Sequence, residues 1–97
     1  LYQLPPEYQT FARQIYPGRF LVEGDTGPEV TLLQTQLNRL AQRDSSLPSV
    51  TADGIFGADT AAAVRALQNR LGYTPTGAVG PVLWSYIITQ GAGYGVF

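Results

Sequence analysis

The sequence contains no cysteine and no histidine, and these two absences exclude much of the chemistry that small domains perform. Without cysteine there is no disulfide framework, no thiolate zinc site and no cysteine nucleophile. Without histidine the chain lacks the commonest general base and the commonest metal ligand. A serine nucleophile would have no histidine partner, and a serine–lysine pair is excluded because every basic residue is arginine. We therefore expect no enzymatic activity, no metal site and no cofactor.

Charge of one sign is also scarce, because six basic residues face seven acidic ones for a net charge of −1. The arginines form no cluster, so the chain lacks the positive surface expected of a protein that binds nucleic acid or an anionic membrane. No run approaches the roughly 20 apolar residues that span a bilayer, and no signal segment begins the chain. We expect a neutral or mixed-charge partner, no nucleic acid, no membrane, and a chain that belongs to a longer protein.

A length of 97 residues, 44% of them hydrophobic, fits one domain with one core. Apolar residues at helical spacing predict helices over about 28–43, 58–71 and 81–89. In the first helix the apolar stripe consists of Val30, Leu33, Leu37, Leu40 and Ala41, and in the second of Thr60, Val64, Leu67 and Leu71. In the third helix we expect Val82, Tyr86 and the pair Ile87 and Ile88 to face inward, with Trp84 partly exposed or covering the core.

The segments outside these helices are predicted to be less regular. Residues 44–52 mix turn formers with Pro48 and indicate a loop. Residues 1–20 form a lead-in in which Tyr8, Phe11 and Ile15 favour a short helix, and residues 91–97 are glycine-rich and indicate a flexible tail or linker. We therefore place the folded module at residues 21–90.

The same pair of glycines, three residues apart, precedes each predicted helix. The pairs are Gly24 and Gly27, Gly54 and Gly57, and Gly77 and Gly80. The first glycine is expected to turn the chain tightly and the second to cap the helix, with proline next at two of the three starts. This spacing is an internal repeat.

Carboxylates also recur at these turns. Glu29 and Asp59 fall in the first turn of their helices, where they complement the helix dipole. Asp53 precedes Gly54 in a strong turn signal. Two carboxylate pairs could serve a hydrolase, Asp53 with Asp59 and Glu23 with Asp25, but turns and helix ends already account for them.

The repeated segments resemble the peptidoglycan-binding domain family, a three-helix module often appended to wall hydrolases. The likeness spans about residues 20–88 and rests on three stretches: 24–30 (GDTGPEV), 53–60 (DGIFGADT) and 77–81 (GAVGP) with Trp84. This sequence departs from the family in two places, because Thr76 stands where the last motif usually has Asp, and Leu83 where Thr commonly precedes the Trp. The third loop is therefore expected to be less polar.

The resemblance implies an all-α fold, a small three-helix orthogonal bundle, here with an extra helical lead-in and a flexible tail. It also implies a non-catalytic module that binds peptidoglycan, by its glycan strand or stem peptide, in a shallow groove among the helix-start loops. Such a module targets or anchors a larger protein, covalently linked to it, to the bacterial cell wall. The loop 44–52 and the segment 16–18 resemble versions in wall proteins of spore-forming Gram-positive bacteria, so the expected location is extracellular, at the wall or the spore envelope.

The candidate ligand-binding residues are those of the motifs and their surroundings. They are Gln34, Asp53, Gly54, Phe56, Gly57, Thr60, Tyr73 and Trp84. Most have a structural interpretation as well: Phe56 suits the core, Gln34 and Gln68 can brace loops, and Asp53 and Thr60 can bond the backbone of the second loop. Tyr73 could line a groove with Tyr86 or lie half-buried. The alternative function is a structural or protein-interaction module of the same fold without wall binding.

Overall fold

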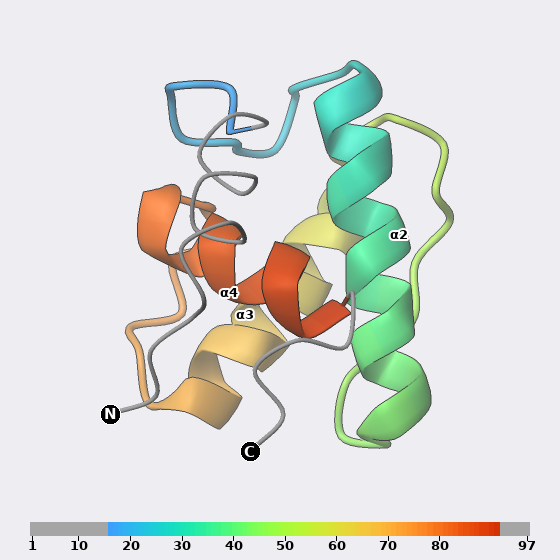
Figure 1. Ribbon diagram of the computed structural model, residues 1–97, viewed down its shortest axis with the longest axis vertical. Coiled ribbons are helices and arrows are strands. Elements are labelled where there is room, and N and C mark those ends of the chain that lie inside the picture. Colours follow the sequence, from blue (N-terminus) through green and yellow to red (C-terminus); the bar gives the residue numbers. More distant parts are fainter. Residues whose placement is uncertain (1–15, 92–97) are drawn as a thin grey trace.

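The computed structural model describes residues 16–91, and within them the chain folds into three helices (Figure 1). These are α2 (Pro28–Arg43), α3 (Ala58–Leu71) and α4 (Pro81–Gly91). In this part of the chain no strand forms; two isolated antiparallel bridges, Leu21 with Val79 and Thr26 with Ile55, join loops instead. Figure 1 shows α2 along the long axis, with α4 lying across it. The expected all-α fold, a bundle of three helices, is confirmed.

Helix α2 begins and ends where its sequence predicts. Gly27 precedes it with a φ of 135°, a value that favours glycine, and Pro28 takes the first helical position, where a missing N–H is tolerated. Glu29 lies in the first turn and Arg43 in the last, each complementing the helix dipole. The expected stripe is buried through Val30, Leu33, Leu37 and Leu40.

Helix α3 also has its predicted bounds. Gly57 caps its start, and Gly72 ends it in the left-handed conformation with a φ of 80°. Ala61, Ala63, Val64 and Leu67 are buried. Small side chains on this helix let its neighbours approach closely.

Helix α4 begins at Pro81 as predicted but ends at Gly91, two residues later than the expected Thr89. Val82 is 71% exposed, so its expected inward position is wrong. Trp84 is 0% exposed, which contradicts the partly exposed alternative and places the ring in the core. The buried positions are Leu83, Trp84, Ile87, Ile88, Thr89 and Gly91. Apart from Thr89, they recur at intervals of one and three or four residues, so they form one helical stripe from which Val82 is excluded.

Gly91 in the last turn of α4 and Tyr16, at the start of the described residues, complete the packing around the core. A Cβ on Gly91 would collide with Gln36 of α2, so glycine allows α4 to lie directly on α2. Tyr16 packs on Trp84 with ring centroids 5.8 Å apart. Gly91 therefore belongs to a helix instead of the expected tail. The helix expected in the lead-in up to residue 15 and the rest of the expected tail, 92–97, lie outside the described residues.

The loop at 44–52 has no helix, as predicted. Asn38 of α2 holds it at Val50, where the side-chain amide donates to the carbonyl and accepts from the N–H, both at 2.7 Å. Among residues 16–91, none of the helices has the length and apolar character needed to cross a membrane.

Candidate functional site

Backbone hydrogen bonds join the loops that precede the three helices. We call residues 22–27 the first loop, 53–57 the second and 76–80 the third. Gly24 N–H donates to Phe56 O at 2.8 Å, Phe56 N–H to Asp25 O at 2.9 Å, and Gly27 N–H to Gly54 O at 3.0 Å. The first and second loops therefore form one ladder.

The third loop is joined to the same layer through the residues before the first loop. Leu21 and Val79 exchange N–H···O bonds of 3.0 and 2.9 Å. Both side chains are fully buried. The three helix starts are thus held together by main-chain bonds, as a cluster of loops over one end of the core.

Gln34 of α2 braces the second loop from inside. Its Nε2 lies 2.8 Å from Ile55 O and 3.2 Å from Asp53 Oδ1, and its Oε1 accepts from Gly54 N–H at 2.9 Å. Nε2 is also 3.0 Å from the hydroxyl of Thr60. Gln34 is fully buried, so these bonds are shielded from water. Its predicted role as a loop brace is confirmed.

Gln68 of α3 braces the third loop in the same way. Its Nε2 donates to Thr76 Oγ1 at 3.1 Å and to Ala78 O at 3.2 Å, while its Oε1 accepts from Gly77 N–H at 2.9 Å. Thr76 thus takes the place that Asp53 has in the second loop. The internal repeat in the sequence is therefore a repeated structural device.

Glycine is required at the turn of each braced loop. Gly54 has a φ of 77° and Gly77 a φ of 79°, both in the left-handed region. A Cβ on Gly54 would lie 2.8 Å from Thr31 Oγ1, and one on Gly77 would lie 3.1 Å from Arg65 Nε. The first glycine of these pairs therefore turns the chain, as predicted.

The loop carboxylates are held by hydrogen bonds that favour their ionised forms. The pKa of Asp53 is lowered, first by the N–H of Ile55 at 3.0 Å and then by Gln34. The pKa of Asp25 is lowered first by the N–H of Val22 at 2.8 Å and further by Arg19, whose Nη1 lies 3.0 Å from Asp25 Oδ2. Carboxylates that stay ionised at neutral pH are poor general acids.

The helix starts of α2 and α3 are also occupied by the chain's own carboxylates. A Cβ on Gly27 would collide with the carboxylate of Glu29, and Asp59 Oδ1 accepts from Thr60 N–H at 2.9 Å. Helix α4 has no acidic residue in its first turn. In residues 16–91 there is no group of three or more acidic side chains that could hold a metal ion.

The predicted ligand-binding residues fall into a buried set and an accessible set. Gln34, Phe56, Thr60 and Trp84 are 0% exposed, and Gly54 is buried. Phe56 is a core residue as expected. Thr60 differs from its expected role, because its hydroxyl accepts from Gln34 instead of bonding the loop backbone. Trp84 lies in the core, away from the second loop, and neither it nor Phe56 offers a ring face to solvent.

The accessible candidates are Asp53, Gly57 and Tyr73, the last 50% exposed. The structure does not bring Tyr73 together with Tyr86, because the two tyrosines line different hollows. Tyr73 instead lies at an open hollow beside the third loop, which we call the third-loop hollow. Its lining residues are Phe20, Gln68, Tyr73, Thr76, Ala78, Gly80, Pro81, Val82 and Leu83.

Sequence reasoning missed Phe20 and placed Val82 inside. Phe20 is 59% exposed, and its ring lies over Gly80, where a Cβ would be 2.7 Å from the ring. The available signal was the alternation along 20–22, in which Phe20 and Val22 are exposed and Leu21 is buried. Such alternation is typical of an extended segment that pairs with another, as Leu21 does with Val79.

Comparison with known proteins agrees with this architecture. The family model described as "Putative peptidoglycan binding domain" matches residues 26–87, which include the end of the first loop, the whole second and third loops, and most of all three helices. The chain is also 41% identical over 71 residues to an uncharacterised protein in the bpoA1 3′ region of Kitasatospora aureofaciens. That alignment covers 72% of this chain but only 56% of the relative. The chain belongs to the peptidoglycan-binding domain family.

Proposed function

We propose that this protein is a non-catalytic module, residues 21–90, that binds peptidoglycan and holds a larger protein on the bacterial cell wall. The observation that carries the proposal is the family match over residues 26–87, because it includes the second and third loops and the end of the first. The proposed location is extracellular, at the wall or the spore envelope. A single small module binds weakly, so attachment to other domains would add effective affinity by multivalency.

The third-loop hollow is the best candidate surface for the glycan. Phe20 and Tyr73 are exposed aromatic side chains that line it together, and Val82 adds apolar surface. Aromatic rings pack on the apolar faces of sugars, and a few polar groups at the edge fix orientation. Thr76 lies at that edge and the amide of Gln68 lines the same hollow.

In this proposal the accessible and the buried members of the predicted binding set have different roles. Tyr73 contacts the ligand from the third-loop hollow, and Asp53 and Gly57 are accessible on the second loop. The buried residues act by shape: Gln34, Phe56 and Thr60 hold the second loop, and Trp84 supports α4 from inside.

The absence of catalysis is proposed from the state of the carboxylates. Asp25 accepts from the N–H of Val22 and from Arg19, and Asp53 accepts from the N–H of Ile55 and from Gln34. Their lowered pKa values oppose protonation. Glu29 and Asp59 are placed over the starts of their own helices. A glycosidase needs one carboxyl that is protonated near neutral pH and another across the scissile bond.

Co-sedimentation with insoluble peptidoglycan sacculi freed of teichoic acid tests the proposal, with insoluble chitin as the control polymer. We expect the folded protein to leave the supernatant with sacculi alone. Phe20→Ala and Tyr73→Ala should each weaken this binding about tenfold, equivalent to roughly 1.4 kcal/mol. Ile55→Ala is the matched control, because Ile55 is 55% exposed but does not line the hollow.

Two results would contradict parts of this proposal. If the folded protein stays in solution with both polymers, wall binding fails. If sacculi bind but the Phe20 and Tyr73 variants bind as well as Ile55→Ala does, the glycan surface lies elsewhere.

A protein-docking role is the second candidate, and the distribution of exposed apolar side chains favours it. The exposed large apolar residues in the described part of the chain are Phe20, Val22, Ile55, Tyr73 and Val82. Val22 and Ile55 lie in the first and second loops, Val82 lies in the first turn of α4, and Phe20 and Tyr73 line the third-loop hollow. Gathered apolar side chains also mark protein interfaces. This role gains support if the folded protein sediments with neither peptidoglycan sacculi nor chitin.

A further inference from the structure

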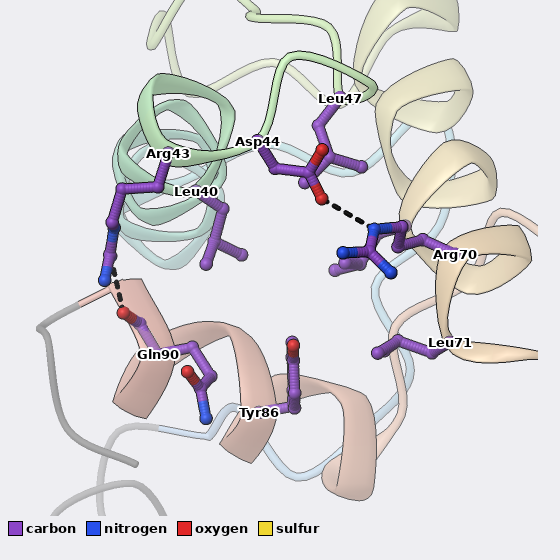
Figure 2. A pocket seen from close by; sticks show the side chains of 9 residues that line it. Leu40, Arg43, Asp44, Leu47, Arg70, Leu71, Tyr86 and Gln90 are labelled. Carbon is purple, nitrogen blue, oxygen red and sulfur yellow. Dashed lines mark hydrogen bonds and ion pairs between the residues drawn. The ribbon is translucent and has the colours of Figure 1, made fainter. Parts of the chain in front are cut away.

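A second hollow lies where α2 and α3 both end, with α4 along its other side (Figure 2). Its volume is about 220 Å³. Its lining residues are Leu40, Arg43, Asp44, Leu47, Leu67, Arg70, Leu71, Tyr86 and Gln90. We call it the arginine pocket. It shares no lining residue with the third-loop hollow, so the two can be tested separately.

The polar wall of the arginine pocket carries more positive than negative charge. Its charged residues are Arg43, Arg70 and Asp44. Asp44 is fully engaged: Oδ2 accepts from Arg70 Nε at 2.7 Å, and Oδ1 accepts from the N–H and hydroxyl of Ser46. Arg43 is tied to α4, where Nη2 donates to the carbonyls of Gln90 and Gly91. One positive charge is therefore left without a counter-charge in the pocket.

Arg70 is paired with Asp44 but still has donors that face the pocket. Within residues 16–91 the structure gives its side chain hydrogen bonds only through Nε, which leaves the N–H groups of both Nη atoms for a ligand. Figure 2 shows its guanidinium between Asp44 and Tyr86, with the terminal nitrogens toward the pocket. The hydroxyl of Tyr86 is directed into the same space. A guanidinium fork beside a hydroxyl suits a carboxylate, which can accept two parallel N–H bonds.

The apolar wall limits the rest of the ligand. Leu40, Leu47, Leu67 and Leu71 supply leucine side chains that suit methyl groups. The pocket volume lies below the roughly 300–1,000 Å³ typical of sites for drug-sized molecules, so the ligand is small. An α-carboxylate next to small apolar side chains satisfies both walls.

We propose that the arginine pocket binds the carboxyl-terminal end of a wall stem peptide, whose last residues are alanines of D configuration. Arg70 and Tyr86 hold the α-carboxylate, and the leucines contact the methyl groups. This proposal rests on the proposed wall-binding function and adds a peptide subsite to the glycan surface. It also gives the module contacts to both chemical components of peptidoglycan.

Titration by heteronuclear NMR with N-acetyl-D-alanyl-D-alanine tests the assignment. We expect saturable shifts of the amides of Arg70, Leu71 and Tyr86. The C-terminal amide of the same peptide should bind at least tenfold more weakly, because it lacks the charge that the guanidinium recognises. The L,L isomer is the stereochemical comparison, and we expect it to bind more weakly because the proposed ligand is the D,D end of the stem peptide.

Two substitutions sharpen the test. Arg70→Gln should weaken binding of the D,D peptide about tenfold, and Tyr86→Phe a few-fold, since it removes only the hydroxyl. Arg39→Gln is the matched control: it removes the same charge from an exposed position of α2 that does not line the pocket. Circular dichroism should show all three variants folded.

The outcomes separate this proposal from wall binding itself. If the wild type sediments with sacculi but the D,D peptide causes no shifts in the pocket, or the amide binds equally well, the peptide subsite is wrong and wall binding stands. Equal binding by Arg70→Gln and Arg39→Gln also overturns it. Tighter binding of the L,L isomer would assign the pocket to a protein C-terminus instead. If the protein binds the D,D peptide through Arg70 but does not sediment with sacculi, the peptide pocket is supported and the proposed glycan surface is wrong.

Discussion

The second and third loops reach nearly the same backbone shape with different side chains. In both, a glutamine from the preceding helix accepts from the glycine N–H and donates to the residues on either side of that glycine. The second loop adds the hydroxyl of Thr60 and a charged partner, Asp53, whereas the third uses the neutral Thr76. Gln34 is 0% exposed and Gln68 is 5% exposed. The device tolerates a change of partner, and the second loop is the more strongly held.

The neighbours of the two loops differ more than the braces do. The second loop is bonded along its length to the first loop, while the third is paired only through Val79 with Leu21. Beside the third loop lies the hollow lined by Phe20, Tyr73 and Val82. We therefore infer that the second loop chiefly stabilises the fold, and we keep the ligand surface beside the third loop as a proposal.

Replacement of each glutamine should give the largest difference in stability between the second and third loops. Gln34→Leu leaves the Gly54 N–H and the Ile55 carbonyl without their partner, and we expect a loss of about 3 kcal/mol in the free energy of unfolding. Gln68→Leu should lose about 1–2 kcal/mol, because its site lacks the additional hydroxyl contact. Urea unfolding followed by circular dichroism measures both. Equal losses would show that the two braces are equivalent.

The turn glycines should show a smaller difference in the same direction. Gly54→Ala places a Cβ against Thr31 and near the carbonyl of Gly27 at a φ of 77°, and should cost about 2–3 kcal/mol. Gly77→Ala meets the same backbone strain at a φ of 79°, but its Cβ meets the flexible Arg65 side chain. We expect about 1–2 kcal/mol there. Thermal unfolding compares them, with Gly24→Ala as a third left-handed position that has nothing within 4 Å.

A pH titration should give the smallest of these differences, as a difference in acid sensitivity between the second and third loops. The pKa of Asp53 lies below its ordinary value of 3.8 in the folded chain, so its contribution to stability is present above that value and is lost as the pH falls through the folded pKa. The amide protons of Gly54 and Ile55 should lose protection from exchange in that acid range, while those of Gly77 and Ala78 keep theirs. Thr76→Asp should give the third loop the same acid sensitivity. If the third loop weakens equally in the unmodified protein, Asp53 is not the cause.

The helix starts, and the ends of α2 and α3, could be predicted from the sequence, since glycine pairs and prolines act within a few residues of their own position. The braces reach further along the chain, by 19–26 residues from Gln34 and 8–10 from Gln68, and were predicted from the equivalent positions of the two glutamines on their helices. Gly27 precedes the first residue of α2 and Gly72 follows the last residue of α3, and the backbone conformation of each glycine needs no distant partner. The stripe of α4 could not be predicted in the same way. Its sequence is apolar on more than one face, so local periodicity allowed Val82 or Trp84 to be inside. The burial of Trp84 depends on tertiary contacts, among them the ring of Tyr16 and the packing of α4 against α2.

The candidate site could be predicted only in part, because the burial of its aromatic side chains also depends on tertiary packing. The motif residues Gln34, Asp53 and Thr60 do meet at the second loop, but burial of Phe56 and Trp84 removes both rings from the surface. The exposed aromatics near the loops are Phe20 and Tyr73, and Phe20 comes from outside the motifs. Exposure depends on which segment covers a side chain, and that information is not contained in spacing along the chain.

By itself, the sequence determined the family, the three helices and the repeated Gln–Gly brace, because these follow from backbone preferences and hydrogen-bonding groups at fixed separations. The tertiary structure decided which aromatic rings are exposed, and it brought Arg70, Asp44 and Tyr86 together around one pocket. These residues lie on three separate segments, and only the packing of α4 against the ends of α2 and α3 places their charges and apolar surfaces side by side.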